Sequence, residues 1–172
     1  MTDVLKNGVF AGRYTAEYED SFVVFLIGMR VNQFWNIRKW LPVSNAMGPM
    51  LEVLYRNPQT GFLGGEAFFR IWPVVPCLVT YWKSFEDLDH FAKSKDQPHL
   101  EPWRKFNQAV GSDGTVGIWH ETYKVEAGAY ECIYGNMPRF GFAAATKHVP
   151  ITSRKDSARN RIEAEKQIEA VK

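Results

Sequence analysis

Two histidines have the settings that most favour chemistry in this chain. His99 follows Pro98 at the predicted restart of a helix, and His120 lies within a predicted strand. Neutral imidazole binds transition metals, haem iron included, and it also transfers protons near neutral pH. One histidine could therefore hold a metal while the other works on its far side. The plainer interpretations are a surface histidine at position 99 and a hydrogen-bonded core histidine at position 120.

The elements that must carry these histidines follow from the spacing of apolar residues. Residues 21–29 form an apolar, β-rich run without clear alternation, which predicts a central strand covered on both faces. Residues 33–55 have roughly helical spacing, but Pro42 and Gly48-Pro49 interrupt it. We therefore predict one broken helix or two short ones.

A second helix is predicted to begin after the N-cap residue Ser84, to pause near Pro98 and to end at Gly111. The remaining predicted strands cover residues 62–71, 77–83, 115–125 and 130–134. The order β-α-β-β-α-β, followed by one more strand, is a ferredoxin-like plan. The predicted fold class is therefore α+β.

Alternation along the predicted strand over residues 115–125 defines the surroundings of His120. One side of this strand carries Val116, Ile118, His120 and Thr122, and the other carries Trp119, Glu121 and Tyr123. His120 thus shares its side with largely apolar neighbours. A cavity on that side would make it a catalytic candidate.

Three other residues are candidates for the same site. Arg30 ends a predicted strand, and its planar guanidinium could pair with a haem propionate or a substrate oxygen, or simply with a carboxylate of the protein. Trp103 and Phe106 could line a haem pocket, although ordinary packing of a helix on a sheet also explains them.

Composition narrows the class of protein. The chain has 172 residues, 45% of them hydrophobic, which suits one compact domain. A net charge of +2 and the lack of a long apolar stretch point to neither nucleic acid nor a membrane as partner. Two cysteines form no disulfide framework and no signal peptide is evident, so we expect a cytoplasmic protein. Aromatic residues at 15% suit a pocket for a planar ligand.

The chain changes character near residue 140. We expect residues 1–140 to form the ferredoxin-like domain and residues 141–172 to form a tail. Part of this tail has approximately helical spacing and could pack on a partner subunit; a mobile tail is the equal alternative.

Several short stretches resemble the carboxyl-terminal half of haem-containing aldoxime dehydratases. They are residues 81–84, 91–94, Pro98-His99-Leu100 and Trp119-His120-Glu121. The resemblance implies haem b as cofactor, with His99 as the axial iron ligand and His120 as the acid/base group on the opposite side. It also implies a cofactor pocket that includes Trp103, Phe106 and Arg30.

The chain also departs from this pattern. The dehydratases carry two ferredoxin-like units in one chain, so a homodimer of this chain would restore their barrel. In those enzymes a serine beside an arginine near the end of a strand helps to hold the oxime oxygen. The matching segment here is residues 29–33, which has Arg30 and no serine, and Asn32 is the candidate substitute as donor.

A second resemblance covers more of the chain. Residues 21–139, with their stretches 25–30 and 133–138, are similar to an uncharacterised monooxygenase-like family of the dimeric α+β barrel superfamily. Both resemblances imply an α+β barrel, a homodimer and a small-molecule substrate. If His120 is the acid/base group, we expect its ring to point into the barrel cavity rather than into the core between sheet and helices. Three functions stay open: an aldoxime-dehydratase-like haem enzyme, a monooxygenase with or without haem, and a non-catalytic protein that binds haem or another small ligand.

Overall fold

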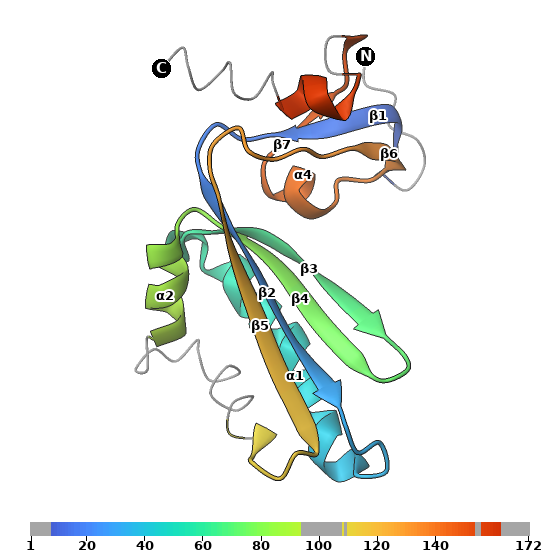
Figure 1. The fold of residues 1–172 in the computed structure, drawn as a ribbon, viewed down its shortest axis with the longest axis vertical. Coiled ribbons are helices and arrows are strands. Elements are labelled where there is room, and N and C mark those ends of the chain that lie inside the picture. The colour runs from blue at the N-terminus through green and yellow to red at the C-terminus, as the bar shows by residue number, and fades with distance from the viewer. Residues whose placement is uncertain (1–7, 94–107, 109, 154–155, 163–172) are drawn as a thin grey trace.

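A four-stranded antiparallel sheet is the centre of the computed structural model, which describes residues 8–93, 108, 110–153 and 156–162 (Figure 1). Its strand order is β3-β4-β2-β5. Along the chain the elements are β2 (Phe22–Val31), α1 (Ile37–Arg56), β3 (Phe62–Arg70), β4 (Val75–Trp82), α2 (Phe85–Lys93) and β5 (Val116–Val125). This order of elements and strands is the ferredoxin-like arrangement, as predicted. The short helix η2 (Pro58–Thr60) makes the turn before β3.

Helix α1 is continuous, although Pro42 and Gly48-Pro49 predict a break. One side of it is buried against the sheet through Val43, Met47, Met50 and Leu54. Their spacing is that of a helix with a single apolar stripe, and burial of four large side chains outweighs the backbone hydrogen bonds that two prolines remove. Helix α2 begins as predicted, since the Ser84 hydroxyl accepts a hydrogen bond of 3.0 Å from the Asp87 amide.

The main core lies between α1, α2 and one face of the sheet. On β2 this face carries Val23, Phe25, Ile27, Met29 and Val31, which are all buried. We name it the helix face of the sheet. The side chains of intervening residues point to the opposite face, which we name the helix-free face.

A second sheet joins the two ends of the chain. It has the strand order β6-β1-β7 and comprises β1 (Phe10–Glu17), β6 (Tyr134–Met137) and β7 (Lys147–Pro150). Helix α4 (Gly141–Ala145) buries Phe142 and Ala143 between this sheet and one end of the helix-free face. Residues 141–150, expected to belong to a tail, are therefore part of a packed unit.

The chain beyond β7 is also attached to the rest of the protein, through Arg161. Arg161 is 6% exposed, and its guanidinium pairs with Glu131 and donates to the Asp156 carbonyl over 2.9 Å. A buried guanidinium needs such partners. In the described portion, no helix is long and apolar enough to cross a membrane. Within the described residues, neither Cys77 nor Cys132 forms a disulfide bond.

Candidate functional site

His120 lies on the helix face of the sheet. Strand β5 is an edge strand, and its register pairs His120 with Ile27 and Ile118 with Met29. Because Ile27 and Met29 point into the helix-covered core, His120 and Ile118 point to the same side. The predicted apolar side of this strand is confirmed. The expectation that His120 points into the barrel cavity is wrong, because a cavity between two sheets is bounded by their helix-free faces.

The surroundings of His120 are apolar and open. Its ring lies 5.8 Å from the ring of Phe25, centroid to centroid, and its side chain is exposed. Ile118 beside it is 47% exposed, whereas Phe25 and Ile27 below it are buried. Within the described part of the chain, His120 makes no hydrogen bond and no ion pair. Both ring nitrogens are therefore available to a ligand.

His99 cannot be placed beside His120. Residues 94–107 lie outside the described residues, so the predicted iron ligand His99 and the predicted pocket residues Trp103 and Phe106 are not described. The helix that precedes them, α2, packs on the helix face through Leu88 and Phe91. The role of His99 stays a prediction.

Arg30 is separated from His120 by the sheet. It follows Met29 on β2 and pairs with Gly117, so its side chain lies on the helix-free face. There it lines an open cavity of 490 Å³ with Arg70, Cys77, Trp119 and three other residues. Arg30 and His120, which the sequence places in one catalytic site, therefore do not share a site within one subunit.

The helix-free face has three cross-strand rows next to this cavity. The middle row consists of Phe68, Cys77, Gly28 and Trp119. On one side of the middle row lie two arginines. Arg30 follows Gly28 by two residues on β2, and Arg70 follows Phe68 by two residues on β3. On the other side lies the row Glu66, Val79, Leu26 and Glu121. One end of the face is thus cationic and the other anionic.

The apolar middle of this face affects the thiol of Cys77. Partial burial raises the pKa of Cys77, and the nearby Glu121 carboxylate raises it further. Cys77 is therefore a neutral thiol rather than a reactive thiolate at neutral pH. Its role in the cavity is that of a small apolar side chain.

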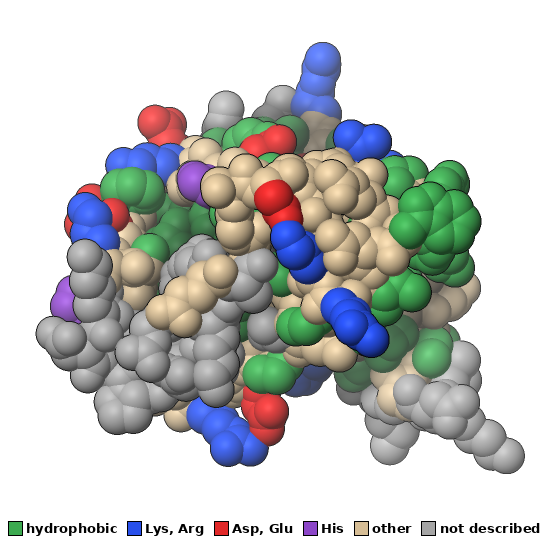
Figure 2. All heavy atoms as spheres, turned by 90° about the horizontal axis from the view of Figure 1, so that it is seen from below, with side chains coloured by type: hydrophobic (Ala, Val, Ile, Leu, Met, Phe, Trp, Pro, Cys, Tyr) green, Lys and Arg blue, Asp and Glu red, His purple; other side chains and the backbone are tan. Residues whose placement is uncertain are grey.

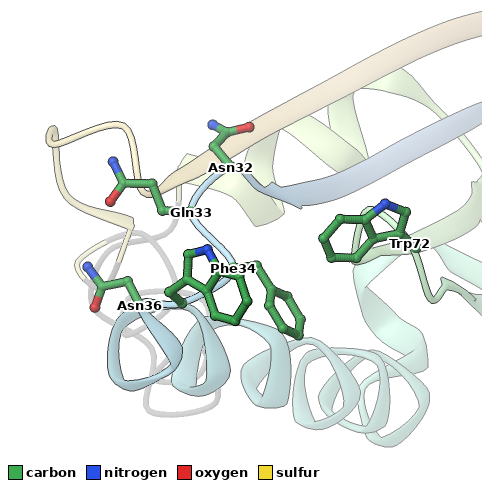
Figure 3. A pocket seen from close by; sticks show the side chains of 6 residues that line it. Asn32, Gln33, Phe34, Asn36 and Trp72 are labelled. Atoms are coloured by element: carbon green, nitrogen blue, oxygen red, sulfur yellow. The ribbon is translucent and has the colours of Figure 1, made fainter.

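Asn32 lies at a second open cavity, of 580 Å³, at the end of β2 (Figure 3). Its side-chain amide donates to the Gly114 carbonyl over 3.2 Å, which joins the end of β2 to the start of β5. Figure 3 shows the amides of Asn32, Gln33 and Asn36 on one side of the cavity and Trp72 on the other, with Phe34 between. Asn32 is thus a structural link, and the structure does not bring it to His120.

Apart from Arg30 and Asn32, the residues that line the two cavities were missed by sequence reasoning. Arg70 and Trp72 come from the end of β3 and the connection to β4, and Trp35 comes from the loop after β2. These segments are far apart in the sequence and meet only through the strand pairing. The run Phe68-Phe69-Arg70-Ile71-Trp72 was nevertheless a visible signal, since so many large apolar residues at a hairpin end cannot all be buried.

Solved structures resemble this fold. A crystal structure of an aldoxime dehydratase in complex with butyraldoxime aligns with a TM-score of 0.60 and 16% sequence identity, over 83% of this chain and 41% of that one. Another aldoxime dehydratase structure gives a TM-score of 0.60 and 18% identity, over 87% and 44%. The chain thus spans less than half of these proteins, and the likeness concerns the fold.

A looser match, with a TM-score of 0.42 and 14% identity over 60% of this chain and 95% of the other, is a dimeric protein of unknown function with a ferredoxin-like fold from Bacteroides fragilis. No curated protein matches the chain in sequence. One family model matches it over residues 22–142, from the start of β2 into α4. Since this match covers most of the 172 residues, the chain belongs to the monooxygenase af470-like family.

Proposed function

We propose that this protein is a haem-dependent enzyme that acts on a small hydrophobic molecule, with His120 as its acid/base group. One observation carries the proposal. An exposed imidazole without a polar partner among the described residues stands on an apolar part of the helix face, at the position that matches the acid/base histidine of aldoxime dehydratases. A histidine kept only for packing would be buried and hydrogen-bonded.

The described residues fit the histidine side of a haem pocket. Ile118 is an exposed apolar side chain beside His120, above the buried Phe25 and Ile27, and such an apolar surface suits a flat, largely apolar macrocycle. His99 would hold haem b. When bound, haem would supply an iron to which the nitrogen of an oxime binds.

His120 would then move a proton. In dehydration of an aldoxime the N–O bond breaks, the carbon-bound hydrogen leaves as a proton, and nitrile and water form. Protonated His120 would donate to the departing hydroxyl oxygen, and the neutral imidazole could then accept the proton from carbon. Once a ligand covers this apolar surface, water would be excluded from the imidazole, which would strengthen these hydrogen bonds.

A monooxygenase is the second candidate, because the family description names this activity, and its cofactor-free form is the one that contrasts with the first candidate. In that function neutral His120 would act as a base toward an acidic hydroxyl of an aromatic or polyketide-like substrate. The same apolar surface would then receive the substrate instead of haem. Haem binding distinguishes the two candidates.

We further propose a homodimer in which the helix-free faces of two copies pack together. Leu26, Cys77 and Val79 on this face are only half-buried within one subunit. A two-fold axis running along the middle row would bring the arginine end of each copy over the glutamate end of the other. Such a face is self-complementary in charge and apolar at its centre, as isologous interfaces are.

Reconstitution with haem tests the function. We expect the purified protein to bind haem b with a Soret band of histidine-ligated iron, and to convert an alkyl aldoxime to the nitrile. His99→Ala should lose this spectrum, whereas His90→Ala, a change on the exposed side of α2, should retain it. A protein without haem affinity that oxygenates an aromatic substrate would support the second candidate instead.

A further inference from the structure

Four large apolar side chains are exposed together at one end of the molecule. Trp35 is 91% exposed, Ile71 78%, Trp72 70% and Phe69 60%. Trp35 comes from the loop after β2, and the other three come from the end of β3 and the connection to β4. We name these four residues the aromatic tip. Few monomeric proteins leave so large an apolar surface in water without a use for it.

The aromatic tip is held in place by Phe34. The Phe34 ring lies 5.8 Å from that of Trp35 and 5.3 Å from that of Trp72, both nearly edge-on. On its other side Phe34 stacks on Trp40 at 5.9 Å, and the Trp40 indole donates to the Phe34 carbonyl over 2.9 Å. The exposed indoles are thus attached to the core rather than free to fold back over it.

Cations lie beside the aromatic tip. Arg38, near the start of α1, is exposed and pairs with no carboxylate among the described residues. Lys39 adds a second cation, which pairs with Asp113. Seen from this end, hydrophobic side chains gather on one side of the molecule with Lys and Arg side chains next to them (Figure 2). The surface therefore combines exposed indoles and aliphatic groups with uncompensated positive charge.

We propose that the aromatic tip docks on the surface of an anionic lipid bilayer. Tryptophan prefers the boundary between lipid headgroups and acyl chains, where its ring is apolar and its N–H is hydrated. Ile71 and Phe69 would enter the acyl region, and Arg38 would meet lipid phosphates. The loop after β2 lies at the end of the long axis, so it can meet a planar surface without obstruction from the rest of the fold (Figure 1).

Charge favours an anionic bilayer over a second copy of the chain as the partner of the aromatic tip. An isologous contact at the aromatic tip would bring Arg38 of two copies together, and the carboxylate of Asp113 already pairs with Lys39. The helix-free face, in contrast, carries both signs of charge. A net charge of +2 for the whole chain conceals this local excess.

Vesicle flotation tests the proposal with the full chain. We expect the protein to float with vesicles of phosphatidylcholine and phosphatidylglycerol, and to bind vesicles of phosphatidylcholine alone much more weakly. Salt should reduce the binding, because it screens Arg38. Ile71→Ser should weaken partitioning roughly ten-fold, and Arg38→Gln about five-fold.

Ile133→Ser is the matched control, because Ile133 is a 48% exposed isoleucine outside the aromatic tip. It should leave flotation unchanged, and circular dichroism should show that both serine variants fold. Equal binding to both vesicle types, or equal loss in both variants, would overturn the proposal. So would absence of flotation together with a dimer that Ile71→Ser dissociates, since the aromatic tip would then be an interface between copies.

Discussion

The indole of Trp119 occupies the space in which a side chain of Gly28 would lie. A Cβ atom at position 28 would come within 2.8 Å of the Nε1, Cε2 and Cζ2 atoms of Trp119. The two residues are register partners on β2 and β5, so the indole can rest across the sheet only because its partner is glycine. This contact forms the floor of the cavity that Arg30 and Arg70 line.

Gly28→Ala should therefore destabilise the protein by roughly 1–3 kcal/mol, since the indole must leave its place. Gly48→Ala is the matched control. Gly48 lies in α1, where an added Cβ atom would meet no atom of the described residues within 4 Å, and removal of a helical glycine gains about 0.5–1 kcal/mol. Urea unfolding monitored by circular dichroism compares the two. Equal stabilities would contradict the packing of Trp119 on Gly28.

His120→Ala should retain the haem spectrum and lose turnover by on the order of a hundred- to ten-thousand-fold, the usual contribution of an acid/base group. The reason is that His120 stands on β5, apart from the proposed iron ligand His99. Thr122→Ala changes the next residue on the same side of β5 and should leave turnover nearly intact. Loss of the Soret band in His120→Ala would instead identify His120 as an iron ligand.

Cys77→Asp should convert the proposed dimer to a monomer, because Cys77 lies in the middle row and the two-fold axis would bring the new carboxylates of the two copies together in an apolar interface. Light scattering measures the mass. Ile118→Asp places the same charge on the helix face and should leave the dimer intact while it weakens haem binding. A wild-type protein that is monomeric at micromolar concentration would refute the two-fold arrangement.

His148 predicts a pH dependence of stability. Its ring stacks on Tyr14 at 4.4 Å, and both ring nitrogens are buried without a hydrogen-bond partner in the described structure. Burial lowers the pKa of His148 below its ordinary 6.5, and the Arg139 guanidinium lowers it further. The unfolded chain then binds the proton more readily, so the neutral ring favours folding above pH 6.5 and this advantage is lost as pH falls through the lowered pKa.

His148→Phe should remove that part of the acid sensitivity. Phenylalanine keeps an aromatic ring on Tyr14 and brings no unsatisfied nitrogen, so above pH 6.5 the variant should be as stable as the wild type or more so, by about 1 kcal/mol. Thermal unfolding across the acid range measures the difference between the two proteins. Parallel curves would show that His148 does not titrate in this window.

The ferredoxin-like order was predictable because each of its elements has a recognisable spacing of apolar residues within its own stretch of sequence. Alternation along β5 correctly placed His120 beside Ile118, and Ser84 correctly marked the start of α2. Helix α1 shows the limit of this reasoning. Pro42 and Pro49 are local signals of a break, whereas the burial that keeps the helix continuous depends on a sheet formed elsewhere in the chain.

The second sheet was not predictable by the same means. Residues 10–17 have no strong alternation, and β1 is stabilised by partners from the other end of the chain. His148 lies in the stretch that we expected to form a tail, and the burial of its ring nitrogens follows from the pairing of β7 with β1. The separation of Arg30 from His120 likewise depends on strand register, which the sequence alone does not specify.

In the smaller sheet β1 pairs with β6 and β7, which lie far from it along the chain, and this affects synthesis on the ribosome. Residues 22–125 contain all strands of the larger sheet, so that sheet can assemble as soon as β5 has left the exit tunnel. Strand β1 is made first but must wait for β6 and β7, which are made last. Throughout that interval its backbone amides and carbonyls are unpaired, so the amino-terminal strand is the segment of the nascent chain most in need of protection by a chaperone.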